Sequence, residues 1–210
     1  LVKMKIFKNT SVTKGYKNSV LAIGNFDGVH VGHKKVLNSA YKKARRIKKK
    51  FGLLTFEPVP VMFFNKKIIN HRLDTLPQKI LNLKNEKLDF VIIQKFNKKF
   101  SKLSYQDFIY KVLYKKIKCK FLYVSKNFKF GKRREGDVSR LKRFEKKFFY
   151  KTIITPPLKK KRRTISSTII RKLLKRGEIL KANNLLNRKW EIIGKVIKGS
   201  QRGRKMGFPT

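Results

Sequence analysis

The segment from Gly24 to His33 constrains the fold of this chain more than any other. It follows an apolar run at 20–23, which predicts a buried strand, and it precedes a lysine-rich pattern typical of a helix. A glycine-rich turn between a strand and a helix leaves backbone N–H groups unpaired at the positive end of the helix dipole. Such a turn binds anions, so the segment predicts a phosphate site where a strand ends.

Glycine and histidine supply the chemistry of this segment. Gly24, Gly28 and Gly32 permit sharp turns and a close approach of the backbone to a ligand. His30 and His33 lie three residues apart, so a helix places both on one side of its first turn. There they suit donation to phosphate oxygens, whose negative charge grows during phosphoryl or nucleotidyl transfer.

Neither zinc chemistry nor thiol chemistry is predicted. His71 stands alone in a predicted loop, and no cysteine lies at a metal-ligand spacing from the two histidines of the turn. The single cysteine, Cys119, lies in an apolar run without an activating partner, which indicates a core residue of a protein in a reducing compartment. No apolar run reaches the roughly 20 residues of a membrane helix. We therefore expect a cytoplasmic protein that does not enter a membrane.

The order of the predicted elements favours an α/β fold with a parallel sheet. Apolar runs that predict strands alternate with helical patterns, an arrangement typical of parallel strands joined by crossover helices. The predicted strands are 20–23, 53–56, 88–93, 120–124 and 151–154, and the predicted helices are 32–49, 73–83, one beginning after 104, 138–148, one capped at 166–168, and 178–186. The segments that follow 57 and 155 are predicted loops. The stretch 190–197 alternates like a half-exposed strand, so we place a domain boundary near 187–189.

The formal net charge of +46 has two interpretations. Lysine and arginine release counterions from phosphate backbones, which favours a nucleic-acid partner. Alternatively the charge reflects composition, because lysine far outnumbers arginine and the basic residues are spread over nearly every predicted element. We favour the second interpretation and expect non-specific nucleic-acid binding at low salt.

Two segments at strand ends carry residues suited to a substrate. Glu57 ends the second predicted strand, where it is either a polar anchor, a metal-facing carboxylate or a solvated loop acid. Asn127 follows the fourth predicted strand and can hydrogen-bond a substrate, with Phe128 or Phe130 against a flat ring. A basic turn without such a role is the alternative for the second segment.

A second phosphate clamp is predicted late in the chain. The hydroxyls of Ser166, Ser167 and Thr168 stand at a predicted helix N-terminus, and Arg171 follows one turn later. Hydroxyls, backbone N–H groups and a guanidinium together suit a phosphate. A plain helix cap followed by an arginine is the alternative.

Together these motifs resemble the bacterial bifunctional riboflavin kinase and FAD synthetase family. The resemblance rests on GNFDGVHVGH at 24–33, TFEP at 55–58, Asn127-Phe128-x-Phe130-Gly131, ISSTIIR at 165–171 and GRKMGFPT at 203–210. It covers nearly the whole chain. The HxGH element alone marks only the wider nucleotidylyltransferase superfamily, whereas the flavin-specific part of the resemblance comes from the segment at 127–131 and from the final motif.

The resemblance implies two domains and one reaction. A Rossmann-like nucleotidylyltransferase domain would span 3–187, followed at 188–210 by the first strands of a truncated β-barrel riboflavin kinase domain. The first domain would join FMN to ATP with Mg²⁺, giving FAD and pyrophosphate. Riboflavin would be a substrate only of the full-length kinase.

The same resemblance implies roles for individual residues. His30 and His33 would contact the ATP phosphates and stabilise the transition state, together with Arg171. The other ATP-binding residues would be Gly24, Phe26, Asp27, Gly32, Ser167 and Thr168, with Gly24, Phe26 and Asp27 on the adenine and ribose side. Asn127 and Glu57 would serve the flavin substrate, and no residue is assigned to a protein-bound metal.

Three departures from the family pattern accompany these expectations. Glu57 stands where some members have aspartate, and Ser125 where the family usually has glycine. The sequence stops at Thr210, inside the kinase motif that begins at Gly207, so we do not expect these residues alone to phosphorylate riboflavin. Met4 is a candidate natural start.

Two other functions remain open at this point. One is a different HxGH-type nucleotidylyltransferase, and the other is a basic protein that binds nucleic acid. A tRNA synthetase fragment is disfavoured because no KMSKS-like lysine loop is recognisable and because the GFPT ending does not fit it.

Overall fold

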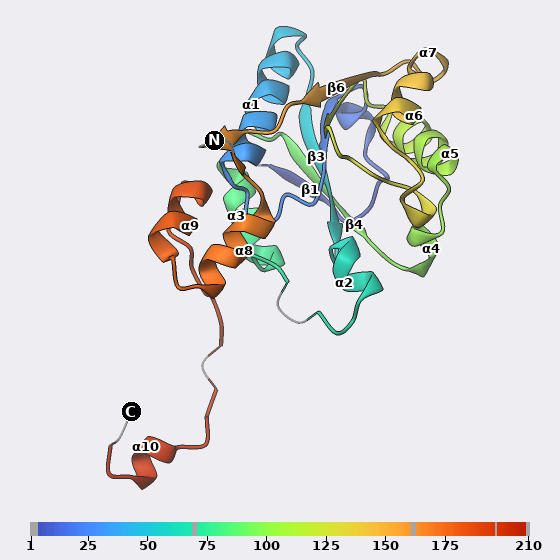
Figure 1. The fold of residues 1–210 in the computed structure, drawn as a ribbon. Helices are drawn as coiled ribbons and strands as arrows, with labels where there is room; N and C mark the ends of the chain where they lie inside the picture. Colours follow the sequence, from blue (N-terminus) through green and yellow to red (C-terminus); the bar gives the residue numbers. More distant parts are fainter. Residues whose placement is uncertain (1–3, 69–70, 161–162, 196, 209–210) are drawn as a thin grey trace.

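A six-stranded parallel sheet forms the centre of the molecule (Figure 1). The structure, a computed structural model, describes residues 4–68, 71–160, 163–195 and 197–208. The sheet has the order β1-β4-β3-β2-β5-β6, and every neighbouring pair is parallel. Its strands are β1 (Lys5–Phe7), β2 (Val20–Ile23), β3 (Phe51–Glu57), β4 (Phe90–Lys95), β5 (Phe121–Ser125) and β6 (Lys151–Thr155). The predicted α/β class with a parallel sheet is confirmed.

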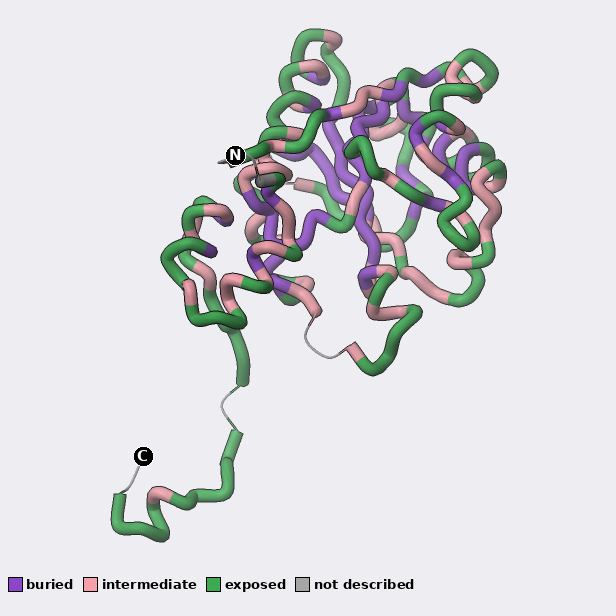
Figure 2. The backbone as a smooth tube through the Cα atoms, viewed as in Figure 1, coloured by how far each residue is buried: buried purple, intermediate pink, exposed green. Residues whose placement is uncertain are grey.

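The two faces of the sheet carry separate cores. Successive residues of a strand point to opposite faces. Val20 of β2 therefore packs in one cluster with Leu37 of α1 (Val31–Arg46), whereas its neighbour Leu21 packs in another with Ile109 of the π-helix η2 (Phe108–Ile117). Figure 2 shows the result as buried strands between helices that are exposed on their outer sides. Continuous apolar runs such as Val20–Ile23 are typical of strands covered on both faces.

The remaining helices are short. They are η1 (Lys14–Tyr16), α2 (Pro60–Phe64), α3 (Leu76–Lys84), α4 (Lys98–Ser101), α5 (Tyr105–Asp107), η3 (Lys132–Arg134), α6 (Val138–Arg143), α7 (Glu145–Phe148), α8 (Ser167–Lys175), α9 (Ile179–Leu186) and α10 (Arg202–Lys205). Ser104 caps α5, because its side chain accepts the Asp107 N–H. The predicted cap at the start of α8 is confirmed at Ser166, and Thr75 caps α3 in a reciprocal arrangement with Gln78.

The order of the strands places a crevice beside β2. The chain runs from β2 to β3 and β4 on one side and then crosses to β5 and β6 on the other. In open parallel sheets, ligands bind outside the carboxyl ends of the strands where this order reverses. Here that point lies between β2 and β5, and the segment from Gly24 to His33 leaves β2 there.

Several predicted elements need correction. β1 was not predicted, because three residues at a sheet edge carry too little pattern. The predicted helix at 138–148 is divided at Phe144 into α6 and α7. The predicted loop after Glu57 contains α2, whose Pro60 stands in its first turn. Part of the basic run after Pro157 forms a two-stranded hairpin, β7 (Lys159–Lys160) and β8 (Arg163–Thr164).

The predicted strand at 190–197 is wrong for the residues that the structure describes. Positions 190–195 and 197 have no strand assignment, and Ile192 is 81% exposed. A strand requires a hydrogen-bonded neighbour, and this segment runs away from the sheet toward α10 (Figure 1). The expected first strands of a barrel are therefore absent from this described part. Gly207 lies exposed in the same tail, and Thr210 lies outside the described residues.

The residues just after the predicted boundary still pack on the folded body. Trp190 donates its ring N–H to the Leu73 carbonyl at 3.0 Å. Gln78 donates its side-chain amide to the Glu191 carbonyl at 2.9 Å. Arg188 pairs with the buried carboxylate of Asp74. The boundary near 187–189 remains a prediction, and packing of the first body continues to position 191.

Candidate functional site

A cleft of about 430 Å³ opens at the crevice beside β2. Segments that follow β2, β3, β5 and β6 line it, together with the start of α8. Its lining includes Gly24, Phe26, Asp27, His30, Gly32, His33, Asn127, Ser167, Thr168 and Arg171. All ten of these were predicted to bind substrate, although they span 148 positions of the chain from Gly24 to Arg171.

The turn after β2 has an unusual backbone. Phe26 and Val29 have positive φ angles of 46° and 39°, which side-chain-bearing residues rarely adopt. Gly28 has a φ of 79°, and a Cβ atom there would lie 2.6 Å from Leu73 Cδ1. Strained turns of this kind persist where the surroundings hold them in place and are concentrated at functional sites. Phe26 and Val29 are buried, so the packing around their side chains keeps the turn in this conformation.

The two histidines stack at the start of α1. His30 is the N-cap, and its Nδ1 accepts the His33 N–H at 3.3 Å. The rings lie 3.7 Å apart between centroids and are nearly parallel, at 18°. A Cβ atom on Gly32 would lie 3.1 Å from the His30 ring, which explains the glycine between them. The glycine therefore permits the stacked pair.

Both histidines are neutral at pH 7. Burial lowers the pKa of His30 to about 4. Burial also lowers the pKa of His33, and the nearby His30 and Lys79 lower it further. His33 Nδ1 is buried without a hydrogen-bond partner among the described residues. Because His30 Nδ1 accepts a hydrogen bond, the proton of the neutral ring is on Nε2, which is left to donate to a ligand.

Asp27 joins the turn to α8. Its side chain accepts the Leu73 N–H at 2.8 Å and pairs with Arg171 Nη1 at 2.7 Å. Ser167 donates its hydroxyl to the Asp27 carbonyl at 2.8 Å. Arg171 also donates to the Thr168 hydroxyl at 3.2 Å. Burial raises the pKa of Asp27, while the Leu73 bond and the neighbouring cations oppose that rise.

Two predicted site residues do not belong to this cleft in the structure. Glu57 pairs with Arg72 at 2.5 Å and is not part of the lining, so it acts here as an ion-pair partner rather than a solvated acid. Gly207 lies in the exposed tail. The suggested ring partner Phe130 is buried in a core cluster, and Phe128 packs against that same cluster. Neither aromatic ring lines the cleft.

The structure adds residues that the sequence analysis did not assign to the site. His71, expected to stand alone, lines the cleft, and so does Thr155, whose buried hydroxyl has no partner among the described residues. Lys79 is fully buried beneath the turn. Thr155 ends β6, so its place at a strand terminus was an available signal. Nothing in the local pattern distinguishes Lys79 from the exposed lysines around it.

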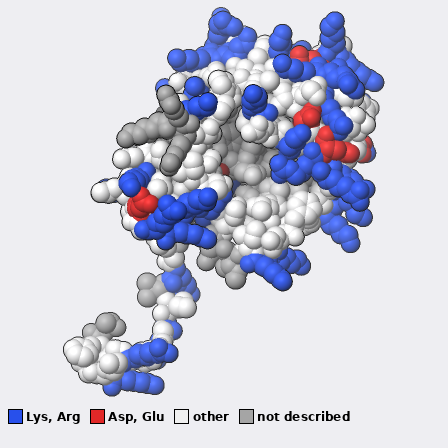
Figure 3. Space-filling view, in the orientation of Figure 1, with Lys and Arg blue, Asp and Glu red and all other residues white. Residues whose placement is uncertain are grey.

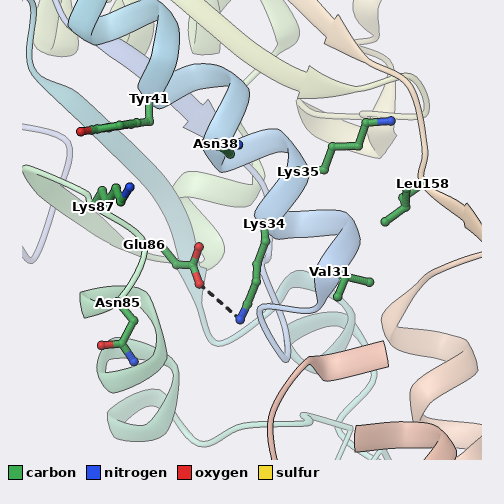
Figure 4. Close-up of a pocket in the computed structure, with 9 residues that line it drawn as sticks. All are labelled: Val31, Lys34, Lys35, Asn38, Tyr41, Asn85, Glu86, Lys87 and Leu158. Carbon is green, nitrogen blue, oxygen red and sulfur yellow. Dashed lines mark ion pairs between the residues drawn. The ribbon is translucent and has the colours of Figure 1, made fainter. Parts of the chain in front are cut away.

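A second hollow of about 500 Å³ lies along α1 (Figure 4). Its cationic lining residues are Lys34, Lys35 and Lys87, and Lys34 pairs with Glu86 at 3.6 Å. It contains no histidine and no arginine. The first cleft therefore remains the candidate active site.

The described residues offer no ready-made metal site. They include no group of three histidine, cysteine or acidic side chains that could hold a metal ion. Asp27 is the acidic residue that lines the cleft, and both of its oxygens are engaged, with Leu73 and Arg171. Mg²⁺ is commonly held by substrate phosphates and waters with only one or two carboxylates. The lining does not fit a protein-held cation.

Comparison with known proteins agrees with this geometry. The model of the FAD synthetase family matches residues 12–169, which include both the histidine turn and the first residues of α8. The chain belongs to the FAD synthetase family. The riboflavin kinase family model matches residues 186–210.

Curated relatives of this FAD synthetase family member are named bifunctional riboflavin kinase/FMN adenylyltransferase. One, from Buchnera aphidicola of Schizaphis graminum, is 40% identical over 99% of this chain and 67% of its own length. Another, from Escherichia coli K12, is 35% identical over 91% of this chain and 61% of its own length. The chain thus spans about two thirds of the relatives' length.

Solved structures share the fold. A Streptococcus pneumoniae protein described as a macrolide-efflux protein superposes with a TM-score of 0.80 at 26% identity, covering 100% of this chain and 67% of that one. Pantoate-beta-alanine ligase from Francisella tularensis gives a TM-score of 0.51 at 17% identity over 93% of this chain and 90% of its own, a likeness of fold alone. Among the described residues of the present chain, no helix is long and apolar enough to span a membrane.

Proposed function

We propose that the cleft transfers the AMP group of ATP to FMN, producing FAD and pyrophosphate. The observation that carries the proposal is the convergence of the histidine turn and the start of α8 on one cleft in a chain of the FAD synthetase family. For the whole protein, we propose a bifunctional enzyme that also phosphorylates riboflavin, as the names of the relatives suggest.

The reaction needs no protein nucleophile. A phosphate oxygen of FMN attacks the α-phosphorus of ATP in line with the departing pyrophosphate, so catalysis consists of positioning and of stabilising charge. His30 and His33 suit the second task, because a neutral imidazole keeps one N–H group that can donate a hydrogen bond to a phosphate oxygen. Their position at the N-terminus of α1 adds the helix dipole.

Arg171 and the start of α8 suit the departing phosphates. The guanidinium already lies in the cleft, held by Asp27 and Thr168. Its side chain is 20% exposed, which leaves part of it open to a ligand. We propose that Arg171, with Ser167 and Thr168, binds the β- and γ-phosphates, and that Asn127 orients the flavin substrate.

Mg²⁺ fits this scheme as part of the substrate. Because the cleft offers no free carboxylate among its described residues, we propose that the cation arrives bound to the phosphate oxygens of ATP. Chelation of Mg²⁺ is then expected to stop turnover without unfolding the protein. A thermal melt with and without EDTA separates these two effects.

The decisive experiment is an assay with FMN, ATP and MgCl₂. We expect FAD and pyrophosphate in equal amounts, detected by chromatography. CTP in place of ATP and riboflavin in place of FMN test the substrate assignment. A folded sample that binds ATP but yields no FAD would rule out FMN as the acceptor and favour another nucleotidylyltransferase.

A further inference from the structure

Lys79 is a cation buried beneath the turn that follows β2. It lies on α3 and is only 1% exposed. Its Nζ donates to the Asn25 carbonyl at 3.0 Å, and the same carbonyl accepts the Thr55 hydroxyl at 3.0 Å. Lysine is almost never buried this deeply without partners, because removing an ammonium group from water is costly. The burial of Lys79 therefore requires nearby groups that stabilise its positive charge.

Acidic groups around Lys79 provide that stabilisation. Four charged groups face it, from the turn, from the end of β3 and from the approach to α3: Asp27, Glu57, Asp74 and Arg72. The three carboxylates favour the ammonium form, whereas Arg72 opposes it, and burial has the largest effect and lowers the pKa of Lys79. On α1, His33 is also near enough to sense the charge. Lys79 is thus the inner cation of a buried ionic cluster.

The outer cations of this cluster differ from Lys79 in exposure. Arg171 pairs with Asp27 and Arg72 pairs with Glu57, and both arginine side chains reach solvent, at 20% and 25% exposure. Arg171 lines the cleft and can turn toward a bound phosphate, whereas Lys79 does not line it. When Arg171 turns away, Asp27 retains Lys79 and the Leu73 N–H as its stabilising partners.

We propose that Lys79 is a positioning residue of the adenylyl-transfer site, which fixes the Asn25 carbonyl and neutralises Asp27 while Arg171 engages the phosphates of ATP. It acts through the turn and touches no substrate. The proposal rests on the proposed function, because it takes ATP as the ligand.

The test compares three variants by ATP binding in calorimetry without FMN. Lys79→Met removes both the donor and the charge, Lys79→Gln retains a donor, and Lys84→Met changes an exposed lysine on the last turn of the same helix. We expect ATP binding to weaken about 10- to 100-fold in Lys79→Met, because the Asn25 carbonyl that shapes the turn loses a charged donor, and a bond of that kind is worth about this factor. Lys79→Gln should weaken binding less, and Lys84→Met should stay within about twofold of wild type.

A pH series separates positioning from a merely structural role. Without the Lys79 charge, Asp27 takes up a proton at higher pH, so the acidic inflection in the pH dependence of ATP affinity should move upward in Lys79→Gln. A folded Lys79→Met protein with wild-type ATP affinity and an unmoved inflection would overturn the proposal. Wild-type protein that binds ATP but makes no FAD would refute the acceptor assignment and leave this test valid.

A double variant covers the case in which Lys79→Met does not fold. Removing one member of a buried ionic cluster leaves an uncompensated charge, which is strongly destabilising. Lys79→Met combined with Asp27→Asn removes the carboxylate that Lys79 is proposed to neutralise. We expect the double variant to fold and to melt above the single one. A double variant that remains unfolded, or melts no higher, would overturn the proposal.

Discussion

At the level of residues, two of the six buried side-chain polar atoms without partners among the described residues belong to the lining of the cleft. His33 Nδ1 and Thr155 Oγ1 are both buried and unpartnered among the described residues, and both residues line the cleft. Leaving such a group unsatisfied costs about 1–3 kcal/mol. In the cleft, a ligand with several oxygens and donors can satisfy both atoms. The atoms therefore point to a polar ligand.

His33→Ala should abolish most FAD formation while leaving the fold intact. The side chain is proposed to donate to charge that develops on the phosphates, and loss of one such donor lowers the turnover rate by about 10²–10³. The measurement is kcat for FAD synthesis, with circular dichroism to verify folding. Lys35→Ala, two residues along the same helix and exposed, is the matched control and should retain wild-type turnover. Near-wild-type kcat in His33→Ala would exclude the assigned role.

His30 should make the folded protein sensitive to acid. Its ordinary pKa is 6.5, and burial holds it at about 4 in the folded state. Between these values the unfolded chain binds a proton that the folded chain does not, so stability falls as the pH drops. This stability is fully present above about pH 6.5, and the loss on approaching pH 4 is on the order of 3 kcal/mol.

The matched variant for this effect is His30→Asn. Asparagine also accepts a hydrogen bond at an N-cap, so the cap is retained while the titration is removed. Melting temperatures from pH 7.5 to 4.5 should fall more steeply for wild type than for the variant. Parallel curves would show that His30 has the same pKa in the folded and unfolded states, which would contradict the prediction.

At the level of elements, the turn between β2 and α1 ties the site to the fold. Gly28 sits against Leu73, which belongs to the same cluster as Ile170 of α8 and Leu186 of α9. Trp190 also packs against that cluster and hydrogen-bonds Leu73. A disturbance of the turn is therefore passed to α8, which carries Arg171.

Three glycine variants measure how much this turn depends on glycine. At Gly15, an added Cβ meets nothing within 4 Å, so Gly15→Ala should change stability by less than about 0.5 kcal/mol. Gly177 has a φ of 71° but open surroundings, so Gly177→Ala should cost about 1 kcal/mol. Gly28→Ala adds a clash at 2.6 Å to the same strain, and we expect a loss of about 3 kcal/mol. Denaturant unfolding checks this order, and equal losses at Gly28 and Gly177 would contradict the packing argument.

Strand-end motifs were predictable because topology, not detailed packing, places them. Gly24 and Asn127 follow different strands, yet the carboxyl ends of parallel strands meet at one edge. Glu57 follows another such strand but turns to Arg72, a partner that no local pattern indicates. Lys79 was missed for a related reason. It lies on the buried side of α3, and two of the three acidic groups that stabilise its charge come from segments distant in the sequence. The tail at 190–197 alternates in the pattern of a strand, but its described residues have no neighbouring strand to pair with.

On the scale of the whole molecule, the positive charge is dispersed. On the face seen in Figure 3, lysine and arginine lie around the top, the right side, the lower edge and the tail, the centre is formed mostly by other residues, and acidic residues are few. A dispersed cationic surface attracts polyanions without selecting among them. The cleft differs from this surface, because it contains a specific ion pair between Asp27 and Arg171. We therefore treat binding of polyanions by the surface as independent of the proposed reaction in the cleft.

Duplex binding should therefore depend on salt and not on sequence. The net charge of +46 predicts tight binding of any duplex at low salt, with the logarithm of affinity falling linearly against the logarithm of salt concentration. The slope should be roughly −0.9 for each phosphate neutralised. Fluorescence anisotropy with two unrelated duplexes measures both quantities, and poly-glutamate serves as a polyanion without bases. Equal salt slopes for the two duplexes and competition by poly-glutamate are expected, because lysines spread along nearly the whole chain recognise charge alone. A preference of more than about 100-fold for one duplex that persists at high salt would instead require base contacts, and would reinstate specific nucleic-acid binding as a function of this chain.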